Sequence, residues 1–148
     1  MQFLEKLNDE GKGLRPDWMH KKMSSTYLLF MQLEKARTIK IGSLGRCRFG
    51  KGHYIYVGSA KRNFHHRINR HLRQKKKIHW HIDYLLRYAR IIKIWSSGLP
   101  EDKVADILST MMQVPVPHFG ASDKKNKSHL FYGKMCQDMA DMALRRVH

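Results

Sequence analysis

The stretch from residue 54 to residue 71 limits the fold of this chain more than any other. It begins with an aromatic and apolar run, which predicts a strand that ends in a turn at Gly58. Beyond a short spacer, apolar residues recur every four positions from Phe64 onward, which predicts a helix. Arg67 and His71 are four residues apart, so they share one face of that helix. We therefore expect both side chains to lie beside the end of the strand.

The charge of the chain points to a polyanionic partner. Its 148 residues contain 29 Lys or Arg and 12 Asp or Glu, a formal net charge of +17. No acidic residue occurs between Glu34 and Asp83, and apolar and aromatic residues alternate with the cations there, so this basic stretch is expected to fold. Nucleic acid is the partner that such a surface favours, with DNA expected and RNA as the alternative.

Cysteine content and hydropathy exclude several classes of protein. Cys47 and Cys136 are too few for a four-cysteine zinc site or a disulfide scaffold, which favours a reducing, cytoplasmic setting. No apolar run approaches the ~18 residues that a membrane-spanning helix needs. The charged N-terminus also lacks a signal-peptide core, so we expect no membrane partner.

The chain divides into an N-terminal extension, residues 1–25, and one domain, residues 26–148, which ends in a helix. Apolar content predicts strands over 26–33, 38–41 and 53–57, with the second strand paired to the first as a hairpin. The remaining predicted elements are a basic loop at 42–52, helices over 64–73, 80–88, 100–112 and 134–147, and strands over 91–95 and 128–132. The expected fold class is α/β, a small and mostly antiparallel sheet flanked by helices.

Several motifs resemble the GIY-YIG nuclease superfamily, and within it the Uri-type stand-alone endonucleases. The similarity extends from about residue 26 to residue 132, although the first motif reads Ser25-Thr26-Tyr27, without the glycine and isoleucine. The segments that carry it are Tyr54-Ile55-Tyr56-Val57-Gly58-Ser59-Ala60, Arg67-Ile68-Asn69-Arg70-His71-Leu72, His79-Trp80-His81-Ile82-Asp83-Tyr84-Leu85-Leu86 and Ser128-His129-Leu130-Phe131-Tyr132.

The resemblance implies a small metal-dependent DNA endonuclease with a GIY-YIG-like fold. By position in the family, the catalytic residues are Tyr27, Tyr56, Arg67 and His71, and Glu101 is the ligand of Mg²⁺ or Mn²⁺. The late asparagine of the family lies nearest to Asn126, in a loop rich in lysine. Basic residues near the motifs are expected to contact nucleic acid: Lys61, Arg62, Arg70, Arg73, Lys75, Lys76 and Lys77.

These residue types suit phosphodiester hydrolysis. Tyr56 can position or deprotonate a water if a nearby metal ion or nearby cations lower its phenol pKa, and Tyr27 can hydrogen-bond the same water or Tyr56. Arg67 offers a planar fork of donors to a phosphate, and His71 can move a proton. Glu101 offers the hard oxygen ligand that Mg²⁺ prefers. This chemistry requires both tyrosines on one face of the sheet, close enough for one phosphate to meet both.

Each candidate also has a structural interpretation. Tyrosines in strands are commonly core residues, and Glu101 after a proline is a common helix N-terminal charge. His81, with His79 and Asp83, suits either a metal site or a structural or DNA-contact role. At the level of function, the alternatives are a non-catalytic nucleic-acid-binding module on the same scaffold and a ribosome-associated RNA-binding protein.

Overall fold

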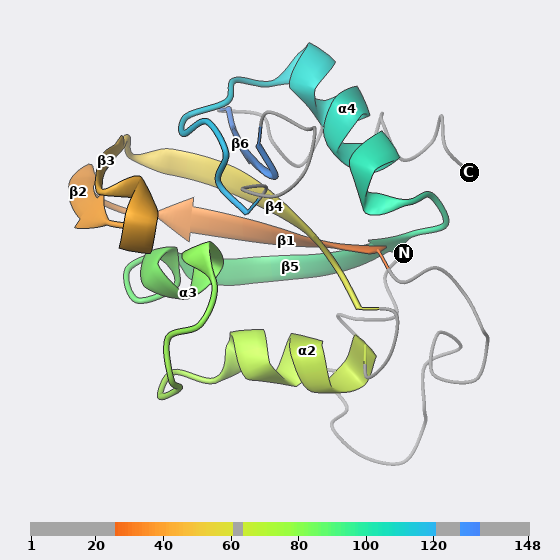
Figure 1. Ribbon diagram of the computed structural model, residues 1–148, viewed down its shortest axis with the longest axis horizontal. Helices are drawn as coiled ribbons and strands as arrows, with labels where there is room; N and C mark the ends of the chain where they lie inside the picture. Colours follow the sequence, from red (N-terminus) through yellow and green to blue (C-terminus); the bar gives the residue numbers. More distant parts are fainter. Residues whose placement is uncertain (1–25, 61–63, 121–127, 134–148) are drawn as a thin grey trace.

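A computed structural model describes residues 26–60, 64–120 and 128–133. Its main sheet has four strands in the order β5-β1-β4-β6, and every neighbouring pair is antiparallel (Figure 1). The strands are β1 (Thr26–Leu33), β4 (Gly52–Ser59), β5 (Arg90–Ser97) and β6 (Leu130–Tyr132). The predicted α/β fold with a mostly antiparallel sheet is confirmed.

Helices cover both faces of this sheet, which explains why β1 is apolar at almost every position. Because successive side chains in a strand point to opposite faces, Leu29 and Met31 pack in one core, and Leu28 and Phe30 in the other. The first core is covered by α2 (Phe64–Leu72) and α3 (His81–Leu85). The second is covered by α4 (Glu101–Met111), which lies on the opposite side of the sheet from α2 (Figure 1).

The predicted pairing of residues 38–41 with the first strand is wrong. β2 (Arg37–Lys40) pairs instead with β3 (Arg46–Phe49), and the two form a separate two-stranded sheet. The first strand has no edge for β2, because β4 and β5 occupy both of its sides. β3 lies inside the predicted basic loop; a one-turn helix, Gly42–Leu44, makes the tight connection before it, with Gly42 at a φ of 44°.

The other predicted elements differ mainly in length. The predicted helices over 64–73 and 100–112 are confirmed as α2 and α4, and the strands over 91–95 and 128–132 as β5 and β6. The predicted helix over 80–88 is shorter, because α3 ends at Leu85 and the chain turns into β5 at Arg90. The predicted structure of 1–25 and 134–147 lies outside the described residues. None of the helices that are described is long and apolar enough to cross a membrane.

Candidate functional site

The two tyrosines predicted to act together lie on the same face of the sheet. Tyr27 in β1 is opposite Gly58 in β4, and Tyr56 is opposite Leu29, so both phenol rings point toward α2. Gly58 belongs to the strand and does not form the predicted turn. A Cβ atom at Gly58 would lie only 2.5 Å from the Tyr27 ring and hydroxyl, so the ring can cross β4 only where the side chain is a hydrogen.

His71, in the last turn of α2, joins the two tyrosines. Its Nε2 lies 2.7 Å from the Tyr27 hydroxyl, a hydrogen bond whose direction depends on which ring nitrogen carries the proton. The centroid of its ring is 5.4 Å from that of Tyr27 and 6.4 Å from that of Tyr56. All three side chains are buried, with exposed fractions of 1% for Tyr27, 2% for His71 and 8% for Tyr56. We call these three residues and Arg67 the Tyr–His cluster.

Arg67 lies one helical turn before His71 and is only half-buried. Its Nη1 donates a hydrogen bond of 2.7 Å to the Ser59 carbonyl, at the end of β4. Its guanidinium also lies over the Trp80 ring, 4.7 Å from the centroid. The predicted arrangement, in which an arginine and a histidine on one helix face lie beside the strand end, is confirmed. Arg67 is the member of the Tyr–His cluster that a ligand in solution can reach most directly.

Burial controls the protonation of the cluster. It raises the pKa of both phenols above the usual value, and the nearby charge of Arg67 only partly opposes this effect. The cations of the protein alone therefore do not give Tyr56 the lowered pKa that deprotonation of a water would need. Burial, followed by the charge of Lys76, lowers the pKa of His71 to about 3. At neutral pH the tyrosines and the imidazole are thus all uncharged.

An ion pair that the sequence did not reveal holds α2 in position. Arg70 donates two hydrogen bonds of 2.8 Å to the two carboxylate oxygens of Asp83, which is fully buried. Asp83 also accepts hydrogen bonds from the backbone of His79 and Trp80, which ties it to the start of α3. Burial alone would raise the pKa of Asp83, but the Arg70 bond and the two backbone donors lower it. Asp83 is therefore the partner of an arginine in this structure.

The predicted nucleic-acid contacts fall into two groups. Arg70 is engaged internally, and its guanidinium also lies 4.3 Å from the Trp80 ring centroid. Lys76 donates hydrogen bonds to the carbonyls of Arg70 and His71, at 3.1 and 2.8 Å, so it caps the end of α2. Exposed side chains that remain available for phosphate are Arg73, Lys75 and Lys77. Lys61 and Arg62 lie outside the described residues.

Glu101, the predicted metal ligand, approaches the sheet from the other side. It is the first residue of α4, and its Oε2 lies 3.7 Å from Nδ1 of His129. The carbonyl of His129 accepts a hydrogen bond from the amide of Val57, the residue after Tyr56. The sequence indicated His129 only as part of a motif. In the structure, its contact with Glu101 places that residue beside β4. Within the described ranges no group of three His, Cys, Asp or Glu side chains could hold a metal ion.

His81 has a structural contact that the sequence did not specify. Its Nδ1 accepts a hydrogen bond of 2.9 Å from the amide of Gly120. Gly120 has a φ of 70°, and a Cβ atom there would lie 3.0 Å from the Tyr56 ring. His81 thus holds the turn at Gly120 against Tyr56, and burial lowers its pKa. Asn126, the other secondary candidate, lies outside the described residues.

Comparison with known proteins gives one match. No curated protein and no solved structure shows a significant similarity to this chain. A protein family described as "Domain of unknown function DUF123" matches residues 26–148, a range that includes every residue of the Tyr–His cluster as well as Glu101 and His129. Because this match covers most of the sequence, the chain belongs to the DUF123 family.

Proposed function

We propose that this protein is a small endonuclease of the GIY-YIG type, which hydrolyses phosphodiester bonds of DNA with a divalent metal ion. One observation carries the proposal. Tyr27, Tyr56, Arg67 and His71 come from two strands and a helix, and they meet at one end of the sheet. The acid-free basic stretch contains Tyr56, Arg67 and His71, and it supplies the charge that attracts a nucleic acid.

Arg67 suits the role of phosphate ligand. A guanidinium has five N–H donors, and only one of those on Arg67 is needed for the bond to the Ser59 carbonyl. That bond and the stacking on Trp80 fix the plane of the guanidinium before a substrate arrives. Preorganised donors of this kind stabilise charge that develops on phosphoryl oxygens, because they need no rearrangement during the reaction.

The tyrosines and His71 suit the handling of the attacking water. Because His71 is neutral at pH 7, its Nε2 can hold the Tyr27 hydroxyl in one orientation without a net charge in the cluster. Tyr56 lies beside the same imidazole and can orient a water toward a phosphate bound at Arg67. The raised pKa of Tyr56 makes its hydroxyl a proton donor and water-orienting group in the protein alone.

Glu101 suits a single-carboxylate metal site. Mg²⁺ is often held by one or two carboxylates, with waters and substrate phosphates as its other ligands. Glu101 is partly exposed, and its Oε2 lies 3.7 Å from Nδ1 of His129, beside β4. Mg²⁺ or Mn²⁺ held there would offset the charge of a nucleic acid that extends from Arg67 around the end of β4 to the α4 side of the sheet.

One observation favours a second function, a non-catalytic nucleic-acid-binding module. Tyr27, Tyr56 and His71 are almost fully buried, and burial keeps both phenols protonated. A buried tyrosine whose hydroxyl is hydrogen-bonded inside the protein, as that of Tyr27 is to His71, is also what a stable core requires. On this second proposal the cluster serves only the fold, and the exposed cations alone carry the function.

The test is cleavage of end-labelled single- and double-stranded DNA with Mg²⁺, Mn²⁺ or EDTA. The endonuclease proposal predicts cutting that EDTA abolishes, and a loss of about 100-fold or more in Arg67→Ala and Glu101→Gln. Lys103→Ala and Asp106→Asn, exposed substitutions on α4, are the matched controls and should cut like the parent. Binding without cutting under every condition would favour the binding module instead.

A further inference from the structure

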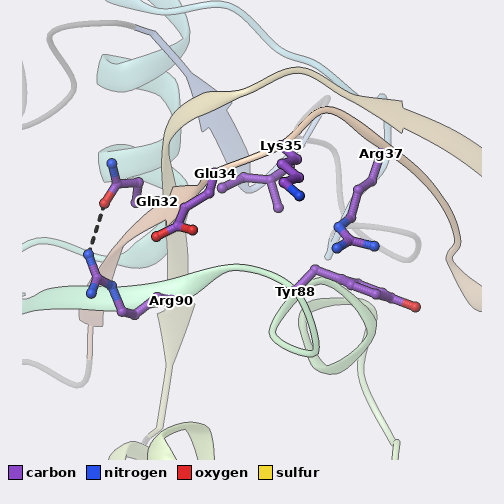
Figure 2. A pocket seen from close by; sticks show the side chains of 7 residues that line it. Gln32, Glu34, Lys35, Arg37, Tyr88 and Arg90 are labelled. Carbon is purple, nitrogen blue, oxygen red and sulfur yellow. Dashed lines mark hydrogen bonds between the residues drawn. The ribbon is translucent and has the colours of Figure 1, made fainter.

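A second site lies at the far end of β1 from Tyr27. It is a pocket of about 370 Å³ between the link from β1 to β2 and the turn that leads into β5 (Figure 2). Its volume lies within the range of small-molecule sites in proteins. The residues that line it are Gln32, Leu33, Glu34, Lys35, Arg37, Tyr88 and Arg90.

An exposed aromatic ring forms one wall of this pocket. Tyr88 is 45% exposed, and among the described residues only Leu72 is another exposed large hydrophobic side chain. The guanidinium of Arg37 lies over the Tyr88 ring, 4.5 Å from its centroid, so a cation and an aromatic ring are already stacked (Figure 2). Aromatic and guanidinium planes are the surfaces on which proteins stack unpaired nucleobases.

The charge of the lining favours an anion. Three cations, Lys35, Arg37 and Arg90, face one carboxylate, Glu34, so the lining has a net charge of 3 − 1 = +2. Glu34 forms no ion pair with these cations in the part of the chain that the structure describes. The Arg90 guanidinium is instead held by Gln32, whose Oε1 accepts a hydrogen bond of 3.0 Å (Figure 2). The lining of the pocket therefore keeps a net positive charge.

We propose that this pocket binds one unpaired nucleotide of the nucleic acid that the Tyr–His cluster acts on. The base stacks against the Arg37–Tyr88 pair, and Lys35 and Arg90 neutralise the adjacent phosphates. This inference rests on the proposed function, and it names a single-stranded segment as part of the substrate.

The two sites are close enough for one strand to reach both. Six residues of β1 separate Tyr27 from Leu33, which is roughly 20 Å at the rise of a strand. A stacked nucleic-acid strand covers that distance in about six nucleotides, at about 3.4 Å each. A stacked strand that follows β1 would thus place the unpaired nucleotide about six positions from a phosphate beside Tyr27, and an extended strand fewer positions away.

The test is equilibrium binding in EDTA, by fluorescence anisotropy, of labelled oligo-dT, oligo-rU and a duplex DNA of the same length. Tyr88→Ala should weaken binding of the single strands by about 10-fold, since stacking on one aromatic ring is worth this much or more. Tyr88→Phe keeps the ring and should bind like the parent. Arg87→Ala removes an exposed neighbour outside the pocket and controls for general charge. Duplex affinity should change less than 2-fold in Tyr88→Ala, because paired bases cannot enter the pocket.

The outcomes separate this proposal from the proposed function. If Tyr88→Ala binds single strands like the parent, or loses duplex binding equally, the pocket proposal fails while the endonuclease proposal stands. If the parent binds single strands through Tyr88 but cuts none with any metal, the pocket proposal holds and the endonuclease proposal fails. A parent that binds none of the three probes overturns both. A loss confined to oligo-dT or oligo-rU would show which of the two strands the pocket accepts and still support the pocket.

Discussion

Six cations lie between residues 67 and 77, and the structure divides them into two groups with different surroundings. The inner cations, Arg67, Arg70 and Lys76, each donate hydrogen bonds to other groups of the protein. The outer cations, Arg73, Lys75 and Lys77, are exposed. Inner and outer cations are identical in formal charge, and the sequence alone assigns Arg70 and Lys76 to the same nucleic-acid contacts as the outer cations.

The difference shows that the cations of this segment have two separate tasks. The inner group positions α2, and the outer group offers charge to a ligand. The inner cations fix the end of α2 and thereby hold His71 against the tyrosines, and Asp83 is the buried counter-ion of Arg70. The outer cations have no such role, and their charge is available to a polyanion. The inner cations should therefore control stability and catalysis, and the outer cations should control affinity.

The largest expected effect is on stability, from Arg70→Ala. This change leaves Asp83 buried without its cation, which typically costs about 3–5 kcal/mol of unfolding free energy. Arg73→Ala, three residues away and exposed, should stay within about 0.5 kcal/mol of the parent. Urea unfolding at pH 7 measures both. Equal effects of the two substitutions would remove the distinction between inner and outer cations.

The second expected effect is a loss of stability in acid, due to His71. Its pKa is about 3 in the folded protein and near 6.5 when unfolded, so below pH 6.5 the unfolded chain binds the extra proton. Stability therefore falls as pH drops from 6.5 toward 3, by about 2 kcal/mol at pH 5. Urea unfolding at pH 7.5 and pH 5 should show this loss in the parent. In His71→Gln the loss of unfolding free energy between pH 7.5 and pH 5 should be smaller by about 2 kcal/mol. A loss as large as that of the parent would contradict a buried, neutral imidazole at His71.

The third expected effect concerns the contact between Gly58 and Tyr27. Gly58→Ala forces the Tyr27 ring away from its position and should cost about 1–3 kcal/mol. In a Tyr27→Ala background the same substitution has room, so its cost should fall by at least about 1 kcal/mol. A double-mutant cycle by urea unfolding measures this coupling. Additive costs would show that the ring does not constrain Gly58.

The smallest effect on stability, but a clear one on binding, is expected from the outer cations. The triple variant Arg73→Ala, Lys75→Ala, Lys77→Ala should unfold within about 0.5 kcal/mol of the parent. If each side chain contacts one phosphate, the slope of log affinity against log salt should become less steep by about 2–3. Titrations of duplex DNA in EDTA at several salt concentrations give this slope. A slope like that of the parent would assign the phosphate contacts to other cations.

The sequence predicted the elements whose pattern is local. The apolar repeat from Phe64 specified α2, and the spacing of Arg67 and His71 specified their common face. The meeting of Tyr27 with Tyr56 followed from the resemblance of the motifs, and the register of β1 with β4 places them on one face. The first two features depend on residues within one or two helical turns of each other. The third depends on the pairing of two apolar strands.

What the sequence did not predict depends on contacts between distant segments. Asp83 pairs with Arg70 across a link without regular periodicity, so no spacing rule could assign it as the counter-ion. β3 alternates charged residues with Cys47 and Phe49, a weak strand signal inside a glycine-rich segment. The raised pKa of Tyr56 follows from its burial, which is a property of the folded chain. The pocket at Tyr88 likewise depends on how the β1–β2 link meets the turn before β5.

The most direct test of the proposed function is the single-turnover cleavage rate of Tyr56→Phe at saturating protein with Mg²⁺. This substitution removes only a hydroxyl and keeps the ring that packs against His71 and Phe119. If Tyr56 orients the attacking water, cleavage should fall by about 100-fold or more, while DNA affinity in EDTA and unfolding free energy stay near those of the parent. Cleavage at the parent rate would show that Tyr56 is only a core residue and that the Tyr–His cluster is not the active site.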